Sequence, residues 1–100
     1  MISTGCTMEH SFKFPHREED VSTVLITYKC EDKIIIDKTL KDCLFKEGRI
    51  YVSVTQEEAL EFPDNTLVKI QIRSTLKNGA TIKSDVINEY SDELLDRRVI

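Results

Sequence analysis

The sequence predicts an all-β fold in which about seven short antiparallel strands form a two-sheet sandwich. Three observations support this prediction. Apolar and polar residues alternate with a period of two in several segments, turn residues separate these segments every ~8–12 residues, and no segment has the period of a long amphipathic helix. With 100 residues, the chain has the size of one domain and is long enough to bury a core.

The first half of the chain begins with two expected strands. Residues 1–8 are small and polar, and we expect them to form a flexible N-terminus before a domain that spans residues 9–90. The first strand alternates from Glu9 until Pro15, which lacks the N–H that a paired strand needs. The second strand covers residues 21–30, which are rich in β-branched side chains. One face of it carries Val24, Ile26, Tyr28 and Cys30.

Three further segments are expected to be extended before the middle of the chain. Residues 34–40 predict a strand that is apolar on both faces at its start. Residues 41–46 predict a short strand or edge segment, which ends in a turn at Glu47-Gly48. Residues 49–55 alternate cleanly, so we expect Ile50, Val52 and Val54 to point inward.

A short helical turn is expected at residues 55–62, between two regular strands. Thr55 and Glu58 have the spacing of a capping box, in which each side chain accepts a backbone N–H from the other end of the turn. Leu60 and Phe62 are placed to pack beneath the sandwich. In an immunoglobulin-like sandwich the chain crosses between the sheets from strand E to strand F, and a turn with an apolar anchor suits this crossing. We therefore predict an immunoglobulin-like fold.

The last third of the chain predicts two more strands and a tail. Residues 66–75 alternate, with Val68, Ile70 and Ile72 expected in the core and the residues between them in water. Asn78-Gly79 predicts a type I′ hairpin turn into residues 80–87, where Ala80, Ile82, Ser84 and Val86 share a face. Residues 91–100 form a C-terminal tail that is either extended or a helical turn capped by Ser91.

Composition and charge argue against two classes of partner. The chain has 14 Lys and Arg residues against 18 Asp and Glu residues, a formal charge of -4, and no Trp. Nucleic-acid binding requires a clustered basic face, so we expect no nucleic-acid partner. No run approaches the ~18 apolar residues of a membrane helix, and the first residues lack the basic and apolar blocks of a secretory signal. We expect no membrane partner.

We expect no catalytic, cofactor-binding or metal-binding residues, and no cofactor. The three glycines are too few for a phosphate-binding loop. His10 and His16 flank the first strand without the spacing of a zinc motif, and we expect both at the surface. Glu57 and Glu58 are neighbours that point about 100° apart on a helix, so they do not converge on one ion. We therefore expect the protein not to be an enzyme.

The three cysteines are odd in number and widely spaced. Cys6, Cys30 and Cys43 form neither a CxxC pair nor a zinc pattern. We expect free thiols in a reducing cytosol, with Cys30 continuing an apolar face into the core. A bridge between Cys30 and Cys43 is the main alternative.

The second half of the chain resembles a group of small proteins encoded in phages and prophages of Gram-positive bacteria. The resembling segments are "VSVTQEEALEF", "VKIQIRSTLKNGATIKSDVI" and "LLDRRVI". The first half is similar more loosely, through "HSFKFP" and "VLITYKCEDKIIIDKTLKDCLF", so the resemblance spans about residues 9–100. It implies an immunoglobulin-like accessory protein encoded among virion structural genes, with no functional residues to transfer. This chain departs from the group in its N-terminal extension, which carries cysteine and methionine.

We therefore expect a non-enzymatic virion structural or assembly protein that acts through protein–protein contacts, in the virion or the bacterial host cytoplasm. The alternative is a small cytosolic regulatory module that binds and inhibits a host protein. If the chain forms a homo-oligomer, the last strand and the tail are the expected interface, because large apolar residues at a chain end favour burial in a partner. The candidate contact residues are Ile82, Val86, Leu94, Leu95, Val99 and Ile100.

Overall fold

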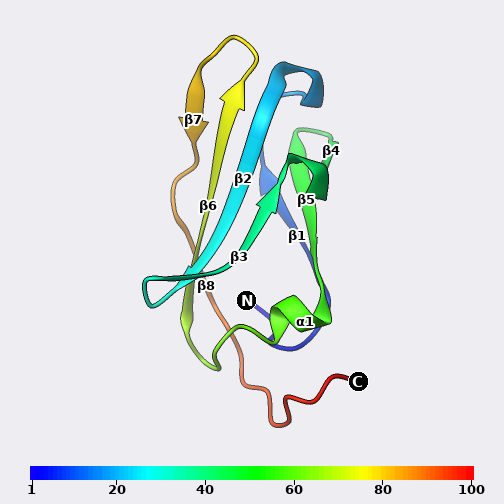
Figure 1. Ribbon diagram of the computed structural model, residues 1–100, viewed down its shortest axis with the longest axis vertical. Helices are drawn as coiled ribbons and strands as arrows, with labels where there is room; N and C mark the ends of the chain where they lie inside the picture. Colours follow the sequence, from blue (N-terminus) through cyan, green and yellow to red (C-terminus); the bar gives the residue numbers. More distant parts are fainter.

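The computed structural model describes all 100 residues and consists of two antiparallel sheets packed face to face (Figure 1). The three-stranded sheet has the order β1-β5-β4. The five-stranded sheet has the order β3-β2-β6, and both β7 and β8 pair with the free side of β6. The strands are β1 (Met8–Lys13), β2 (Val21–Cys30), β3 (Lys33–Thr39), β4 (Cys43–Lys46), β5 (Arg49–Val54), β6 (Leu67–Leu76), β7 (Thr81–Lys83) and β8 (Ile87–Tyr90).

This strand order confirms the predicted immunoglobulin-like sandwich. The three-stranded sheet corresponds to strands B, E and D of that fold, and the five-stranded sheet corresponds to C′, C, F and G. The structure has eight strands because strand G is interrupted and counts as β7 and β8. Helical structure is limited to α1 (Gln56–Ala59) and to two 3₁₀ turns at Glu18–Asp20 and Leu40–Asp42. None of these is long or apolar enough to cross a membrane.

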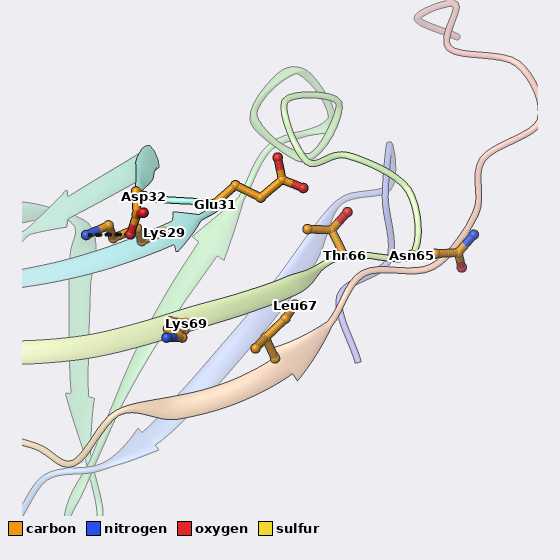
Figure 2. A pocket seen from close by; sticks show the side chains of 7 residues that line it. All are labelled: Lys29, Glu31, Asp32, Asn65, Thr66, Leu67 and Lys69. Atoms are coloured by element: carbon orange, nitrogen blue, oxygen red, sulfur yellow. Dashed lines mark ion pairs between the residues drawn. The ribbon is translucent and has the colours of Figure 1, made fainter.

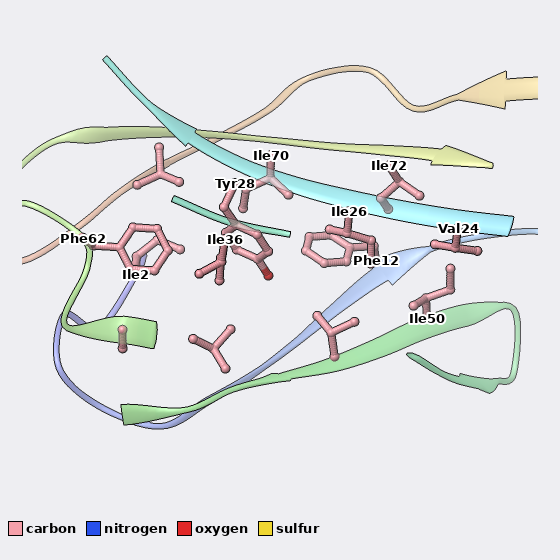
Figure 3. Packing of buried hydrophobic residues seen from close by; sticks show 14 of the residues in the cluster. Ile2, Phe12, Val24, Ile26, Tyr28, Ile36, Ile50, Phe62, Ile70 and Ile72 are labelled. Atoms are coloured by element: carbon pink, nitrogen blue, oxygen red, sulfur yellow. The ribbon is translucent and has the colours of Figure 1, made fainter. Parts of the chain in front are cut away.

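The core lies between the sheets and follows the expected alternation. On β6, Val68, Ile70 and Ile72 are buried, whereas Lys69 and Arg73 are exposed. Figure 3 shows Ile70 and Ile72 in the core beside Tyr28 of the neighbouring strand β2, with Phe12 of the other sheet in the same buried layer. The inward residues predicted on β2 and β5 are buried as well. They are Val24, Ile26, Tyr28, Cys30, Ile50, Val52 and Val54.

The helical turn α1 carries the chain from β5 in one sheet to β6 in the other, as predicted. The Thr55 hydroxyl accepts the backbone N–H of Glu58 at 3.2 Å, and the Glu58 carboxylate accepts the N–H of Thr55 at 3.0 Å. Phe62 is fully buried and contacts Tyr28 edge-on. The second anchor is Ala59 and not Leu60, which is only half-buried because it lies at the end of the turn.

The hairpin between β6 and β7 is confirmed, but its predicted turn type is wrong. Thr75 lies opposite Thr81, and the backbone N–H of Leu76 donates to the carbonyl of Ala80, so three residues form the loop. Only Gly79 has a positive φ, of 92°, and its N–H donates to the carbonyl of Leu76. A three-residue loop of this kind needs one left-handed residue, whereas a type I′ turn needs two.

The first residues pack against the domain, although the sequence led us to expect a flexible segment. Ile2 and Thr4 are buried. Ile2 forms a parallel bridge with Ser91, in which its N–H donates to the carbonyl of Tyr90 and its carbonyl accepts the N–H of Asp92. Ile2 thus extends the sheet beyond β8, and Figure 3 shows its side chain beside Phe62. A single isoleucine in a polar segment has no periodicity that would reveal this role.

Candidate interaction surface

The C-terminal segment, residues 91–100, has no helix or strand and lies at the end of the sandwich that carries α1 (Figure 1). Ser91 is buried, donates its hydroxyl to the carbonyl of Pro63 and accepts the N–H of Thr66. It therefore joins two loops and does not cap a helix. Arg97 completes the attachment, with hydrogen bonds to the carbonyls of Leu60 at 2.9 Å and Phe62 at 3.2 Å.

Asp64 strengthens this attachment of the C-terminal segment at two points. Its carboxylate accepts a hydrogen bond from Arg97 at 2.6 Å and another from the backbone N–H of Leu94 at 3.2 Å. The Leu94 side chain packs beside Gly5, where a Cβ atom would lie only 2.4 Å from it. Leu94 therefore belongs to the contacts of its own domain, because Gly5 leaves room for it.

The remaining apolar side chains of the C-terminal segment are presented to solvent. Leu95 is 93% exposed, Val99 is more than half exposed, and Ile100 is fully exposed. Arg98 next to them is bound to Asp96 by hydrogen bonds of 2.6 to 3.1 Å. Four residues of this segment were predicted at an interface. Leu95, Val99 and Ile100 are exposed and available to a partner, whereas Leu94 packs within its own domain.

The last strand is interrupted by a β-bulge, which alters the predicted face of Val86. Arg73 lies opposite Lys83 and Ile70 lies opposite Ile87. Between these pairs β6 has two residues, whereas the partner strand has three, 84–86. The bulge is fixed by Ser84, whose N–H donates to the carbonyl of Ile72 at 2.9 Å.

The inserted residue reverses the phase of the strand, so Ile82 and Ile87 both pack towards the core. Val86 therefore does not share the face of Ile82, and its side chain is 47% exposed. A bulge also hinders the addition of another strand to an edge. The structure thus brings Ile82 and Val86 to one edge of the sandwich but on different faces.

An apolar recess of about 270 Å³ opens at this edge, between the loop after β1 and strand β7. We call it the edge recess. It is lined by Lys13, Phe14, Pro15, His16, Ile72, Ser74, Ile82, Lys83 and Ser84. Phe14 and Ile72 are buried and form its apolar base, whereas Lys13 and Lys83 are exposed at its rim. The sequence could not reveal it, because β1 and β7 are far apart in the chain and share no hydrogen bonds.

A second, polar cleft of about 480 Å³ lies at the turn between β2 and β3 (Figure 2). Lys29 and Lys69 lie opposite each other on neighbouring strands, and Lys29 is 3.9 Å from Asp32. Leu67 is its single hydrophobic lining residue. Glu31 and Asp32 both have positive φ angles, which gives the two-residue turn type I′ geometry. Paired opposite charges offer no preference for one ligand class, so we assign this cleft none.

The predicted surface residue His10 is half-buried between the sheets. Its Nδ1 atom lies 2.6 Å from the hydroxyl oxygen of Tyr28, which is fully buried. Burial and the N-terminal ammonium group lower the pKa of His10, and Glu89 opposes them. Burial, with the charges of Glu58 and Cys43, raises the pKa of the Tyr28 phenol. This pair is therefore neutral near pH 7, as a polar contact within a core should be.

Glu58 has a structural role, as the sequence indicated, and shares it with Lys38. Lys38 is buried and donates to both carboxylate oxygens of Glu58, at 2.7 and 2.9 Å. Burial opposes ionisation of Glu58, but the hydrogen bonds from Lys38 and the N–H of Thr55 outweigh it and lower the pKa of the carboxyl group. Glu57 is exposed and makes no ion pair. The two glutamates thus do not act as a pair.

The cysteines are separate and unpaired in the structure. Cys30 is buried at the end of β2, Cys43 is half-buried on β4, and Cys6 is exposed. Burial raises the pKa of the Cys43 thiol to about 11 and also raises that of Cys30. No group of three or more His, Cys, Asp or Glu side chains is arranged to hold a metal ion. Comparison of this chain with models of protein families, with curated proteins and with solved structures finds no match.

Proposed function

We propose that this chain is a structural or assembly protein of a phage or prophage that works through protein–protein contacts and not as an enzyme. The observation that carries the proposal is the anchored C-terminal segment. It leaves Leu95, Val99 and Ile100 exposed to water, although the backbone N–H of Leu94 and the guanidinium group of Arg97 attach the segment to the domain on both sides of Leu95. Exposed large apolar side chains that lie together on a surface mark interaction sites.

The attachment makes this surface suited to binding. A free tail would lose conformational entropy when it met a partner, whereas a tail already held at Leu94 and Arg97 loses less. The resemblance to phage and prophage proteins supplies the proposed setting, the virion. A regulatory module that binds a host protein would use the same surface, so the two candidates differ in where the protein is found.

Incorporation into particles tests this proposal. Phage particles are purified from cells that express the gene, and the chain is quantified by mass spectrometry relative to the major capsid protein. We expect a fixed stoichiometry that survives washing at high salt. Leu95→Asp should reduce incorporation, whereas Leu44→Asp should not, because Leu44 is a similarly exposed leucine (63%) on β4 of the other sheet.

Two results would contradict the proposal. Absence of the chain from particles, with normal amounts in the cytoplasm, would favour the regulatory alternative. Equal loss of incorporation in the Leu95 and Leu44 variants would show that the C-terminal segment is not the contact surface.

A further inference from the structure

We propose that the C-terminal segment of one copy docks into the edge recess of a second copy, and that Leu95 is the side chain that fills it. This inference rests on the proposed function, since it identifies one partner of the C-terminal segment as the chain itself. The contact would join two different surfaces and would therefore run from head to tail.

The edge recess has the size and lining of a site for a protein side chain. Its volume of about 270 Å³ lies below the ~300–1,000 Å³ typical of sites for small molecules. Phe14 and Ile72 provide an apolar base, and Ile82 adds a half-buried wall. A branched aliphatic side chain that filled it would remove apolar surface from water on both partners.

The rim of the edge recess is basic, and the C-terminal segment carries one unpaired acidic side chain close to Leu95, while Arg97 and Arg98 are each paired with an aspartate. The lining of the edge recess includes Lys13, Lys83 and His16 but no carboxylate, although the whole chain carries a charge of -4. Leu95 lies between Glu93 and Asp96 in the sequence. Asp96 is bound to Arg98, whereas Glu93 is exposed and makes no ion pair. Glu93 is therefore the charge available to meet the basic rim.

A copy of the chain cannot fill its own recess with Leu95. The molecule is 47 Å long, and β7 lies at one end of it while the C-terminal segment lies at the other (Figure 1). Leu95 is also held on both sides, through the hydrogen bonds of Leu94 and Arg97 to Asp64. Both surfaces thus remain free in a single copy, and the contact has to be intermolecular.

The same charges disfavour a symmetric contact between two recesses. A twofold interface places one patch against its own copy, which here would bring Lys13 and Lys83 towards a second basic rim. The bulge at residues 84–86 likewise hinders pairing of two β7–β8 edges. A head-to-tail contact leaves one free recess and one free segment at each step, so it generates a ring or a filament.

Sedimentation of the full-length protein over a range of concentrations tests the inference. Two variants each remove one side of the contact: Leu95→Asp alters the segment, and Lys13→Glu/Lys83→Glu reverses the charge of the rim. Each should raise the dissociation constant at least about tenfold. The matched controls are Leu44→Asp and Lys33→Glu/Lys46→Glu, which alter an exposed leucine and exposed lysines elsewhere and should leave association unchanged.

Mixing the two variants distinguishes a head-to-tail contact from a symmetric one. The Leu95 variant retains an intact recess, and the lysine variant retains an intact segment, so an equimolar mixture should form dimers with one native contact. A mixture that stays monomeric overturns the inference, and so does association that persists in either variant alone.

Failure of this inference can be told apart from failure of the proposed function. A full-length protein that is monomeric at every concentration overturns docking between copies, while its presence in particles would still show contact with other components. Loss of incorporation by Leu95→Asp, with association between copies intact, would likewise overturn only the role of Leu95 in the recess.

Discussion

Single residues in this protein join elements that the sequence separates. Glu58 accepts the N–H of Thr55 and also two hydrogen bonds from Lys38, so it fixes the helical turn to the edge strand β3. Although Lys38 lies on an edge strand, its side chain is buried and serves this ion pair. The capping function was predictable from the spacing of Thr55 and Glu58, but the ion pair was not, because Lys38 lies 20 positions away.

The pair of His10 and Tyr28 predicts that stability falls in mildly acidic solution. The Tyr28 hydroxyl has no hydrogen-bond partner other than Nδ1 of His10. A protonated imidazole can only donate at this nitrogen, so it leaves the hydroxyl proton of Tyr28 without an acceptor in the core. Because the folded-state pKa of His10 is lowered below about 6.5, the folded state binds fewer protons there than the unfolded state. We expect full stability above about pH 6.5 and a progressive loss as the pH falls through the folded-state pKa, measured as the urea midpoint.

His10→Gln supplies the control for this pH dependence. Glutamine retains a hydrogen-bond acceptor for Tyr28 but does not titrate. The variant should show a flatter profile between pH 7.5 and pH 5.5 than the natural sequence. Identical slopes in the two proteins would show that other groups cause the loss.

At the scale of elements, the sequence predicts a strand and its buried face wherever apolar and polar residues alternate with a strict period of two. On β6, Val68, Ile70 and Ile72 alternate without interruption, so both the strand and its buried face were predictable. The same rule failed for Val86, because one inserted residue reverses the phase of the strand and leaves no compositional signal. The edge recess was unpredictable for a related reason, since it depends on how β1 and β7 lie in different sheets.

The helical turn provides a prediction at this scale, because one hydroxyl group caps α1. Thr55→Ala removes the acceptor for the N–H of Glu58, and we expect it to lower the free energy of unfolding by about 1 kcal/mol. Ser53→Ala is the control, since Ser53 is exposed on β5 and its hydroxyl makes no hydrogen bond in the structure; its effect should stay within about 0.5 kcal/mol. Urea unfolding of the unmodified protein and the two variants measures the change in the free energy of unfolding for each substitution. Equal effects of the two substitutions would contradict the prediction that the Thr55 hydroxyl stabilises α1.

At the scale of the whole molecule, three of the four sheet edges carry features that hinder pairing with another strand. Strand β4 is only four residues long, and β3 carries an irregularity in its pairing with β2. On the opposite side of the five-stranded sheet, Ile2 pairs with Ser91 at the end of β8, and the bulge interrupts the edge before β8. Each of these features hinders indiscriminate strand addition. The contacts proposed above use side-chain surfaces instead, namely the C-terminal segment and the edge recess.

The three cysteines allow the stability of the whole domain to be measured without denaturant. Cys6 is exposed and should react with a thiol reagent in the native protein, whereas Cys30 is buried in the core and should react only when the sandwich opens. When reclosing is faster than labelling, the rate at Cys30 follows the population of the open state. Ile70→Ala, a truncation of a buried side chain, should cost about 2–5 kcal/mol and so speed labelling of Cys30 by about thirtyfold or more.

Arg73→Ala is the control for this labelling experiment, because Arg73 is exposed on the same strand and should change the rate at Cys30 little. Gln71 is less suitable, since its side chain donates to the carbonyl of Ser84 in the bulge at 3.1 Å. Labelling of Cys6 should be unchanged in both variants, and full unfolding without reductant should release three thiols per chain. Equal acceleration of Cys30 by the two variants would show that the faces of β6 are assigned wrongly. A total of one thiol would instead reveal a bridge between Cys30 and Cys43, which would tie β2 to β4 across the two sheets.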